Sequence, residues 1–252
     1  MTAKQHSIAL VTGAAAGIGR ATALAFADAG CDVVVADLDG ERLESVAQEI
    51  QKKGRRALAC ATDVSDSKSV AALHDSAVAM FGHIDYACNN AGIEGIQGAT
   101  GDTTIENFDR VISVNLRGVF LCLQAQLRIM APRKSGAIVN MASVAGLVGF
   151  AGLPAYCASK GGVVQLSKTA AIEYAEQGIR INAVCPGAIK TEMIDRITGQ
   201  DVEAEKQFAA LHPMNRMGTA KEIADTVVWL CLPQASFITG QALAVDGGMV
   251  AR

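Results

Sequence analysis

The stretch IALVTGAAAGIG, from Ile8 to Gly19, decides the fold of this 252-residue chain. A short apolar run, Ile8–Thr12, leads into a turn that contains Gly13, Gly17 and Gly19, and a helix-period segment follows it. Glycine permits a tight turn and lets backbone N–H groups come close to an anion at the start of a helix. The spacing G-x-x-x-G-x-G differs from the commonest dinucleotide fingerprint, so the turn alone does not separate a phosphate-binding loop from a structural one.

Short apolar strands and amphipathic helices alternate along the rest of the chain. The expected strands span 8–12, 32–36, 57–62, 84–89, 137–142, 179–185 and 241–245. The expected helices span 17–29, 41–53, 67–81, 104–130, 154–176 and 219–232. This alternation predicts an α/β fold of the Rossmann type, a doubly wound parallel sheet of seven strands with helices on both faces. An eight-fold barrel is the rival, but the glycine-rich first turn argues against it.

One segment breaks this alternation. Residues 189–214 mix Met193, Ile197 and Phe208 with charged residues, which predicts one or two short amphipathic helices that form a flap. No linker, repeat or low-complexity tract divides the sequence, so we expect residues 1–252 to form one domain.

The bulk composition excludes several classes of function. A formal net charge of -3 gives no reason to expect nucleic acid or an anionic membrane as a partner. The seven cysteines are odd in number and include no C-x-x-C pair, so they are expected to be small core residues in a reducing compartment, with no metal site.

The ends and the long uncharged run do not indicate export or membrane insertion. The start MTAKQHSIALVTG lacks the small-residue cleavage site of a signal peptide. The uncharged run 135–159 contains Asn140, Pro154 and several serines and glycines, so it is too polar for a spanning helix. A cytoplasmic protein is expected.

Asp37 ends the second expected strand, about 20 residues after the glycine turn. A carboxylate there can accept hydrogen bonds from both ribose hydroxyls of an adenosine, whereas it would repel a 2′-phosphate. The compensating basic residue is missing beside Gly17 and Asp37, with Arg42, a turn into the helix, as the exception. NAD is therefore favoured over NADP, although Asp37 could also be a loop carboxylate beside Asp39.

Tyr156 and Lys160 are four residues apart on an expected helix, so they share one face. A tyrosine has a reference pKa of about 10, and a nearby ammonium is expected to lower it, which would make the phenol a general acid/base. Ser143 follows the fifth strand, where its hydroxyl could bind a substrate oxygen, and Asn115 interrupts an apolar helix. Each residue alone also fits a structural role: a helix start, a turn serine or a satisfied core amide.

Taken together in this order, the motifs resemble the short-chain dehydrogenase/reductase family, in its roughly 250-residue cytosolic branch. The resemblance covers essentially the whole chain and rests on T12-G-A-A-A-G-I-G19, Asp63-Val64, N89-N-A-G92, Asn115, Ser143, Y156-C-A-S-K160, P186-G187 and V245-D-G-G248.

The resemblance implies a role for each matched position. Tyr156 would be the acid/base, Lys160 would lower its pKa and hold the nicotinamide ribose, and Ser143 would bind the substrate oxygen. Asn115 would hold a water that relays protons from Lys160. The cofactor-binding positions would be Gly13, Gly17, Ile18, Gly19, Asp37, Asp63, Val64, Asn89, Ala91, Gly92, Tyr156, Lys160, Pro186, Gly187, Ile189 and Thr191.

The resemblance also implies a substrate lid at 189–214 and a homotetramer in which the helices 104–130 and 154–177 pair across a two-fold axis. The small residues of the second helix would permit close approach there, or they could pack internally on the sheet; they are Ala158, Ser159, Gly161, Gly162 and Ala170. The expected substrate-facing residues, which fit the core equally well, are Val144, Leu147, Val148, Phe150, Leu153, Met193, Ile197 and Phe208, with Glu94 as the nearby charge.

The expected reaction is reversible, NAD-dependent hydride transfer between a small-molecule secondary alcohol and its ketone. An NADPH-dependent carbonyl reductase of the 3-oxoacyl type is one alternative, and it would need a basic group near the ribose. A non-enzymatic dinucleotide-sensing protein is the other, and it should have lost Tyr156 or Lys160, which this chain retains.

Overall fold

The structure, a computed structural model, describes residues 6–251. The first five residues of the expected N-terminus and the last residue of the expected domain lie outside this range. Seven parallel strands form one sheet in the order β3-β2-β1-β4-β5-β6-β9. The strands are β1 (Ile8–Thr12), β2 (Asp32–Asp37), β3 (Ala57–Ala61), β4 (Tyr86–Asn89), β5 (Gly136–Met141), β6 (Ile179–Pro186) and β9 (Ala242–Val245). The predicted doubly wound fold is confirmed.

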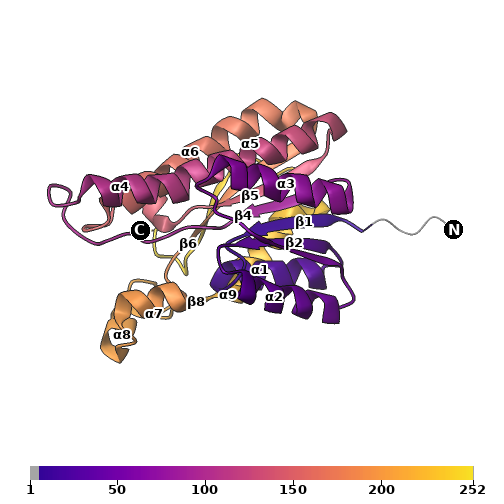
Figure 1. Ribbon diagram of the computed structural model, residues 1–252. Helices are drawn as coiled ribbons and strands as arrows, with labels where there is room; N and C mark the ends of the chain where they lie inside the picture. Colours follow the sequence, from indigo (N-terminus) through magenta and orange to yellow (C-terminus); the bar gives the residue numbers. More distant parts are fainter. Residues whose placement is uncertain (1–5, 252) are drawn as a thin grey trace.

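Helices cover both faces of the sheet (Figure 1). One layer contains α1 (Gly17–Asp28), α2 (Gly40–Lys52) and α9 (Ala220–Cys231), and the other contains α3 (Ser67–Phe81), α5 (Gly118–Met130) and α6 (Pro154–Tyr174). β1 shows why both layers are needed. Ala9 and Val11 belong to the core cluster of the first layer and Ile8 and Leu10 to that of the second, and all four are buried.

The predicted helix over 104–130 is interrupted. The chain forms α4 (Ile105–Ile112), then a π-helical turn at Ser113–Arg117, then α5. The wider turn places Asn115 inside the protein, where its amide hydrogen-bonds both backbone groups of Ile93 at 2.8 Å. The sequence did not predict the π-helical turn, because the pattern of apolar residues continues through it without a break.

The flap segment (residues 189–214) carries two short helices, as predicted: α7 (Glu192–Thr198) and α8 (Val202–Ala210). They project from the body beside the carboxyl ends of the strands (Figure 1). A parallel pair of two-residue strands, β7 (Ile189–Lys190) and β8 (Gly218–Thr219), joins the two ends of the projection, and the sequence had not predicted it. Strands this short carry no period-2 pattern.

The small residues of α6 pack mainly within the subunit. Ser159 and Ala170 are buried, and a Cβ at Gly162 would lie 2.7 Å from the side chain of Leu116. Ala158 is exposed. Of the two roles expected for these small residues, internal packing accounts for most of them.

Within residues 6–251, no helix is both long and apolar enough to cross a membrane.

The turns after β1 and β4 are hydrogen-bonded to each other at the centre of the sheet. Thr12 Oγ1 accepts from the backbone N–H of Asn90 at 3.1 Å and of Ala91 at 3.2 Å. Asn90 Nδ2 donates to the carbonyl oxygens of Thr12 and Gly13, both at 3.1 Å. β1 and β4 are the strands from which the strand order runs outward in opposite directions, so this contact lies at the topological switch point where doubly wound sheets bind ligands.

Gly19 should be the least replaceable glycine of the turn. A Cβ there would lie 1.9 Å from the Gly13 carbonyl oxygen, whereas a Cβ at Gly40, in the corresponding first turn of α2, would have its nearest neighbour at 4.0 Å. We expect Gly19→Ala to lower the free energy of unfolding by about 2–3 kcal/mol and Gly40→Ala to change it by less than about 0.5 kcal/mol. Urea denaturation measures both, and equal effects of the two variants would contradict the packing shown here.

Candidate active site

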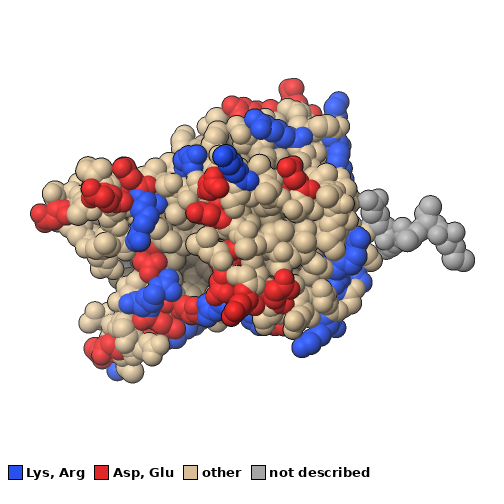
Figure 2. All heavy atoms as spheres, viewed as in Figure 1, with Lys and Arg blue, Asp and Glu red and all other residues tan. Residues whose placement is uncertain are grey.

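Two adjoining hollows lie at the carboxyl ends of the strands. The first, here called the cleft, runs from the end of β2 past the glycine turn, and the second, the inner cavity, lies between β5, α6 and the flap segment. Both are lined by Ile18, Asn90, Gly92, Thr191 and Met193, so they form one continuous space. Figure 2 shows the surface hollowed between the body and the flap segment, with acidic and basic side chains around the rim.

Most predicted cofactor positions line this space. The cleft is lined by Gly13, Gly17, Ile18, Asp37, Asp63, Val64, Ala91, Gly92 and Thr191. The inner cavity is lined by Ser143, Tyr156, Lys160, Pro186, Gly187 and Ile189, and again by Ile18, Gly92 and Thr191.

Asn89 and Gly19 do not line either hollow. Asn89 is buried, and its side chain bonds Gln126 and Asn140 within the core, so this side chain does not face the cleft and a contact between Asn89 and the cofactor stays a prediction. Successive residues of a strand point to opposite sides, and the next residue, Asn90, takes the place expected for it. Gly19 is buried beneath the Gly13 carbonyl, where it shapes the turn from behind.

The carboxylate of Asp37 is held at the outer end of the cleft by backbone groups. Its Oδ2 accepts from Ala15 N–H at 2.9 Å and its Oδ1 from Leu38 N–H at 2.7 Å. An ionised carboxylate has about four lone-pair sites, so acceptor capacity for two hydroxyl groups is left. The side chain therefore ties β2 to the glycine turn and still presents acceptors to the cleft.

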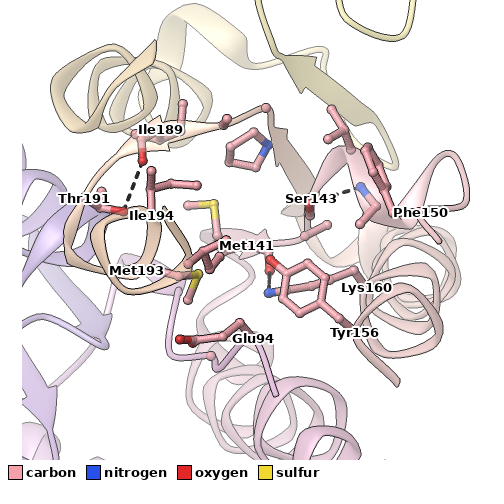
Figure 3. A pocket seen from close by; sticks show the side chains of 18 of the residues that line it. Glu94, Met141, Ser143, Phe150, Tyr156, Lys160, Ile189, Thr191, Met193 and Ile194 are labelled. Carbon is pink, nitrogen blue, oxygen red and sulfur yellow. Dashed lines mark hydrogen bonds between the residues drawn. The ribbon is translucent and has the colours of Figure 1, made fainter. Parts of the chain in front are cut away.

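Ser143, Tyr156 and Lys160 meet at the wall of the inner cavity (Figure 3). Ser143 lies two residues after the end of β5. Its hydroxyl accepts from Ala145 N–H at 3.1 Å and is close enough to the Tyr156 phenol to lower the pKa of that group. Lys160 is buried; its Nζ donates to the Met141 carbonyl at 2.8 Å and lies 5.6 Å from the centroid of the Tyr156 ring. The spacing Y-x-x-x-K thus places a phenol and an ammonium on the same side of α6.

The electrostatics of this pair differ from the sequence expectation. Burial raises the pKa of Tyr156 to about 12; the Ser143 hydrogen bond opposes this rise, and the charge of Glu94 adds to it. Burial also lowers the pKa of Lys160 to about 8. Burial of the phenol therefore has the largest effect, and the expected lowering of the Tyr156 pKa by Lys160 is not found.

Asn115 stands behind the cavity wall. Besides its two bonds to Ile93, its Nδ2 donates to Ser159 Oγ at 3.2 Å. A Cβ at Gly92 would lie 3.2 Å from Asn115 Oδ1 and 3.4 Å from Lys160 Nζ, so both polar groups lie immediately behind this glycine. The geometry makes Asn115 a buried support of the turn that follows β4, and its predicted role in a proton relay stays a prediction.

Apolar side chains from β5, α6 and the flap segment line most of the inner cavity. Six of the expected substrate-facing residues are among them: Val144, Phe150, Leu153, Met193, Ile197 and Phe208. Leu147 and Val148 lie outside this lining, 38% and 44% exposed, because the short 3₁₀ turn at 144–146 directs them outward. Glu94 also lines the cavity, but Arg196 Nε donates to it at 3.0 Å.

Sequence reasoning singled out Arg42 and Glu94 but missed their partners, Glu192 and Arg196. Arg42 and Glu192 are 150 residues apart and form a two-pronged hydrogen bond, and Arg196 reaches Glu94 across 102 residues. No local spacing indicates either pair. Asn90, in contrast, lay within the quoted N-N-A-G motif and could have been found from it.

Known proteins resemble this chain over nearly all of its length. Residues 13–250 match a family model described as enoyl-(acyl carrier protein) reductase. The cyclohexanol dehydrogenase of Acinetobacter sp. (strain SE19) is 40% identical over 98% of this chain and 96% of that protein. The cis-4-hydroxycyclohexanecarboxylate dehydrogenase of Sinomonas cyclohexanicum is 42% identical over 97% and 96%. The 3-oxoacyl-[acyl-carrier-protein] reductase FabG of Staphylococcus aureus (strain Mu50 / ATCC 700699) is 40% identical over 98% and 99%.

The solved structures agree with the sequence relatives. The crystal structure of levodione reductase superposes with a TM-score of 0.94 at 39% identity, covering 97% of this chain and 98% of that one. Fold, motif order and relatives lead to one conclusion: the chain belongs to the short-chain dehydrogenase/reductase family, oxidoreductases that use nicotinamide dinucleotide cofactors.

Proposed function

We propose that this protein is an NAD-dependent dehydrogenase that catalyses reversible hydride transfer between a secondary alcohol and its ketone. The observation that carries the proposal is the meeting of Tyr156, Ser143 and the buried Lys160 at the wall of a cavity that is continuous with the cleft beginning at Asp37.

The residues of the cleft fit a nicotinamide dinucleotide. Gly13, with φ +66°, and Gly17, with φ +53°, leave the turn without side chains at positions where other residues would be strained. Asp37, Asp63 and Val64 would hold the adenosine, and Pro186, Gly187, Ile189 and Thr191 would border the nicotinamide together with Lys160 and Tyr156. When bound, the dinucleotide supplies the hydride acceptor or donor.

The charges around the adenosine end favour NAD over NADP. Asp37, Asp39 and Asp63 line this part of the cleft and would repel a 2′-phosphate. Arg42, the basic residue that the sequence left as an exception, hydrogen-bonds Glu192 through both terminal nitrogens. The cation that an NADP-dependent enzyme would need there is therefore already engaged.

The three side chains at the cavity wall divide the work of the reaction. Ser143 would position the substrate oxygen, and Tyr156 would exchange a proton with that same oxygen. With a raised pKa the Tyr156 phenol stays protonated at neutral pH, so it can donate to a carbonyl. In the oxidising direction it must act as phenolate, which Lys160 and the positive charge of an oxidised nicotinamide would stabilise.

An uncharged alicyclic secondary alcohol is the substrate class that we favour. The apolar lining of the inner cavity suits a hydrocarbon ring. Of the two charged residues in this lining, Glu94 is paired with Arg196, and Lys160 belongs to the cluster with Tyr156 and Ser143. Two relatives named above act on hydroxylated cyclohexanes, by their names.

The FabG relative supports an alternative, reduction of a 3-oxoacyl thioester with NADPH. An NADPH-dependent function needs a cation for the 2′-phosphate, and it is disfavoured because Arg42 is bonded to Glu192. A dinucleotide sensor without activity would have no need of the Tyr156, Ser143 and Lys160 cluster.

We further infer that residues 1–252 act as one domain with 189–214 as substrate lid. Homotetramer assembly and a cytoplasmic location remain predictions.

Cyclohexanol and substituted cyclohexanols, offered with NAD or NADP, test the proposal directly by the absorbance of the reduced cofactor. We expect turnover with NAD, and we expect Tyr156→Phe to lower kcat/KM by about 10²–10⁴-fold because the proton carrier is removed. NADH titration should show unchanged binding. Tyr174→Phe, at the far end of α6, is the matched control and should behave as wild type. Full activity of Tyr156→Phe, or turnover with NADP alone, would overturn the proposal.

The pH dependence of alcohol oxidation follows from the raised pKa of Tyr156, about 12. Below that value each rise of one pH unit increases the phenolate fraction about tenfold. We expect kcat/KM for oxidation to rise with pH from about 6 to 9, while ketone reduction, which uses the protonated phenol, does not. A flat oxidation profile over this range would show that another group carries the proton.

Lys160 should lower the free energy of unfolding although turnover depends on it. It is buried with a pKa lowered to about 8, so its charged form is disfavoured inside the protein. We expect Lys160→Met to raise the free energy of unfolding at pH 7 by about 1–3 kcal/mol and to abolish turnover. Thermal and urea unfolding measure the first effect. A loss of stability would mean that the bond to the Met141 carbonyl outweighs the burial of the charge.

A further inference from the structure

The outer end of the cleft holds an ion pair that joins the body to the flap segment. Arg42, in the first turn of α2, donates from Nη1 to Glu192 Oε2 at 3.0 Å and from Nη2 to Glu192 Oε1 at 2.7 Å. Glu192 is the first residue of α7. The two side chains are 50% and 51% exposed, and both line the cleft.

Arg42 lies where a basic residue would read the ribose. Asp37 and Asp39 are close enough for their charges to act on its guanidinium, and Arg42 Nε lies 3.8 Å from Asp39 Oδ2. A guanidinium presents a planar pair of donors that matches phosphate as well as carboxylate. Left unpaired beside Asp37, Arg42 would be a receptor for a 2′-phosphate.

The Glu192 carboxylate binds the Arg42 groups that a 2′-phosphate would bind. Its two carboxylate oxygens accept from both terminal nitrogens, which are the groups that would bind a phosphate in the same two-pronged manner. The other arginine that lines the cleft, Arg196, is bonded to Glu94. Both arginines in the described lining are thus engaged by carboxylates, and the adenosine end presents Asp37, Asp39 and Asp63.

We propose that Glu192 is a specificity-determining residue for the cofactor: by occupying the guanidinium of Arg42 it denies that cation to a 2′-phosphate, so that NAD preference depends on Glu192 as well as on Asp37. The inference rests on the proposed NAD-dependent function and deepens it. It assigns to the flap segment a part in reading the adenosine end of the cofactor.

The expected effect is moderate. Exposed ion pairs are weak and screened by salt, so releasing Arg42 from Glu192 requires little free energy. Removing the Glu192 carboxylate also removes one negative charge that faces the phosphate. Together the two changes should tighten NADP binding about tenfold relative to NAD, while Asp37 still opposes NADP.

Calorimetric titration of the intact protein with NAD and with NADP, without substrate, tests the inference through binding alone. We expect wild type to bind NAD more tightly. Glu192→Gln should lower the ratio of the NADP to the NAD dissociation constant about tenfold, with NAD affinity nearly unchanged. The double variant Glu192→Gln/Arg42→Gln should lose that gain, because the cation that receives the phosphate is gone.

Glu205→Gln is the matched control for the loss of one carboxylate charge from the flap segment. Glu205 lies in α8, pairs with Lys190, and lines neither hollow, so this variant removes the same charge from the same segment. Its ratio should equal that of wild type. A gain as large as that of Glu192→Gln would show that loss of any negative charge from the flap segment causes the effect, and would overturn the inference.

The remaining outcomes separate the inference from the proposed function. An unchanged ratio in Glu192→Gln, or a gain that survives in the double variant, overturns the role of Glu192 while wild-type preference for NAD stands. A wild-type protein that prefers NADP, or binds neither dinucleotide, overturns the proposed function itself. All the substituted side chains are at least partly exposed, so these variants should fold as wild type does.

Discussion

The close approach of two turns, one after β1 and one after β4, is the constraint on which the site depends. Asn90 donates hydrogen bonds to Thr12 and Gly13 across the switch point. The neighbouring atoms leave no room for a side chain at Gly13 or Gly19. Because helices then leave the sheet on opposite faces, a cleft opens directly above these turns. The glycines therefore act twice. They let the two turns meet, and they leave backbone N–H groups uncovered at the start of α1.

Burial governs the chemistry at the inner end of that cleft. The same apolar surroundings that suit a hydrocarbon substrate disfavour charge on both Tyr156 and Lys160, in opposite senses of protonation. Without a cofactor, Tyr156 is a neutral phenol at neutral pH, and Lys160 loses its proton more easily than an exposed lysine does. In the proposed mechanism, a positively charged nicotinamide would favour the Tyr156 phenolate that alcohol oxidation would need. The binding of the cofactor and the readiness of the proton carrier would then be coupled through electrostatics, without any movement of the backbone.

The flap segment is attached differently from the rest of the molecule. The sheet and its helices are joined by two large apolar clusters, to which the flap contributes only Ile189 as a buried member. The flap also contacts the body through the strands β7 and β8, the buried His212, which accepts from Ala188 N–H, and exposed ion pairs. Exposed ion pairs contribute little free energy each, so the charged side chains Glu192 and Arg196 can be replaced at little cost in stability.

Sequence by itself determined the architecture and most of the site. Strand bounds agree with the structure to within two residues, and the glycine turn, Asp37, Ser143, Tyr156 and Lys160 lie where the motifs placed them. These features are encoded by residues close together in the chain, where period and spacing can be read directly. Tertiary structure alone decided that Asn90, not Asn89, faces the cleft, that a π-helical turn carries Asn115 inward, and that Glu192 engages Arg42. Each of these depends on which distant segments meet, and on the balance of burial and pairing where they meet, which no local pattern records.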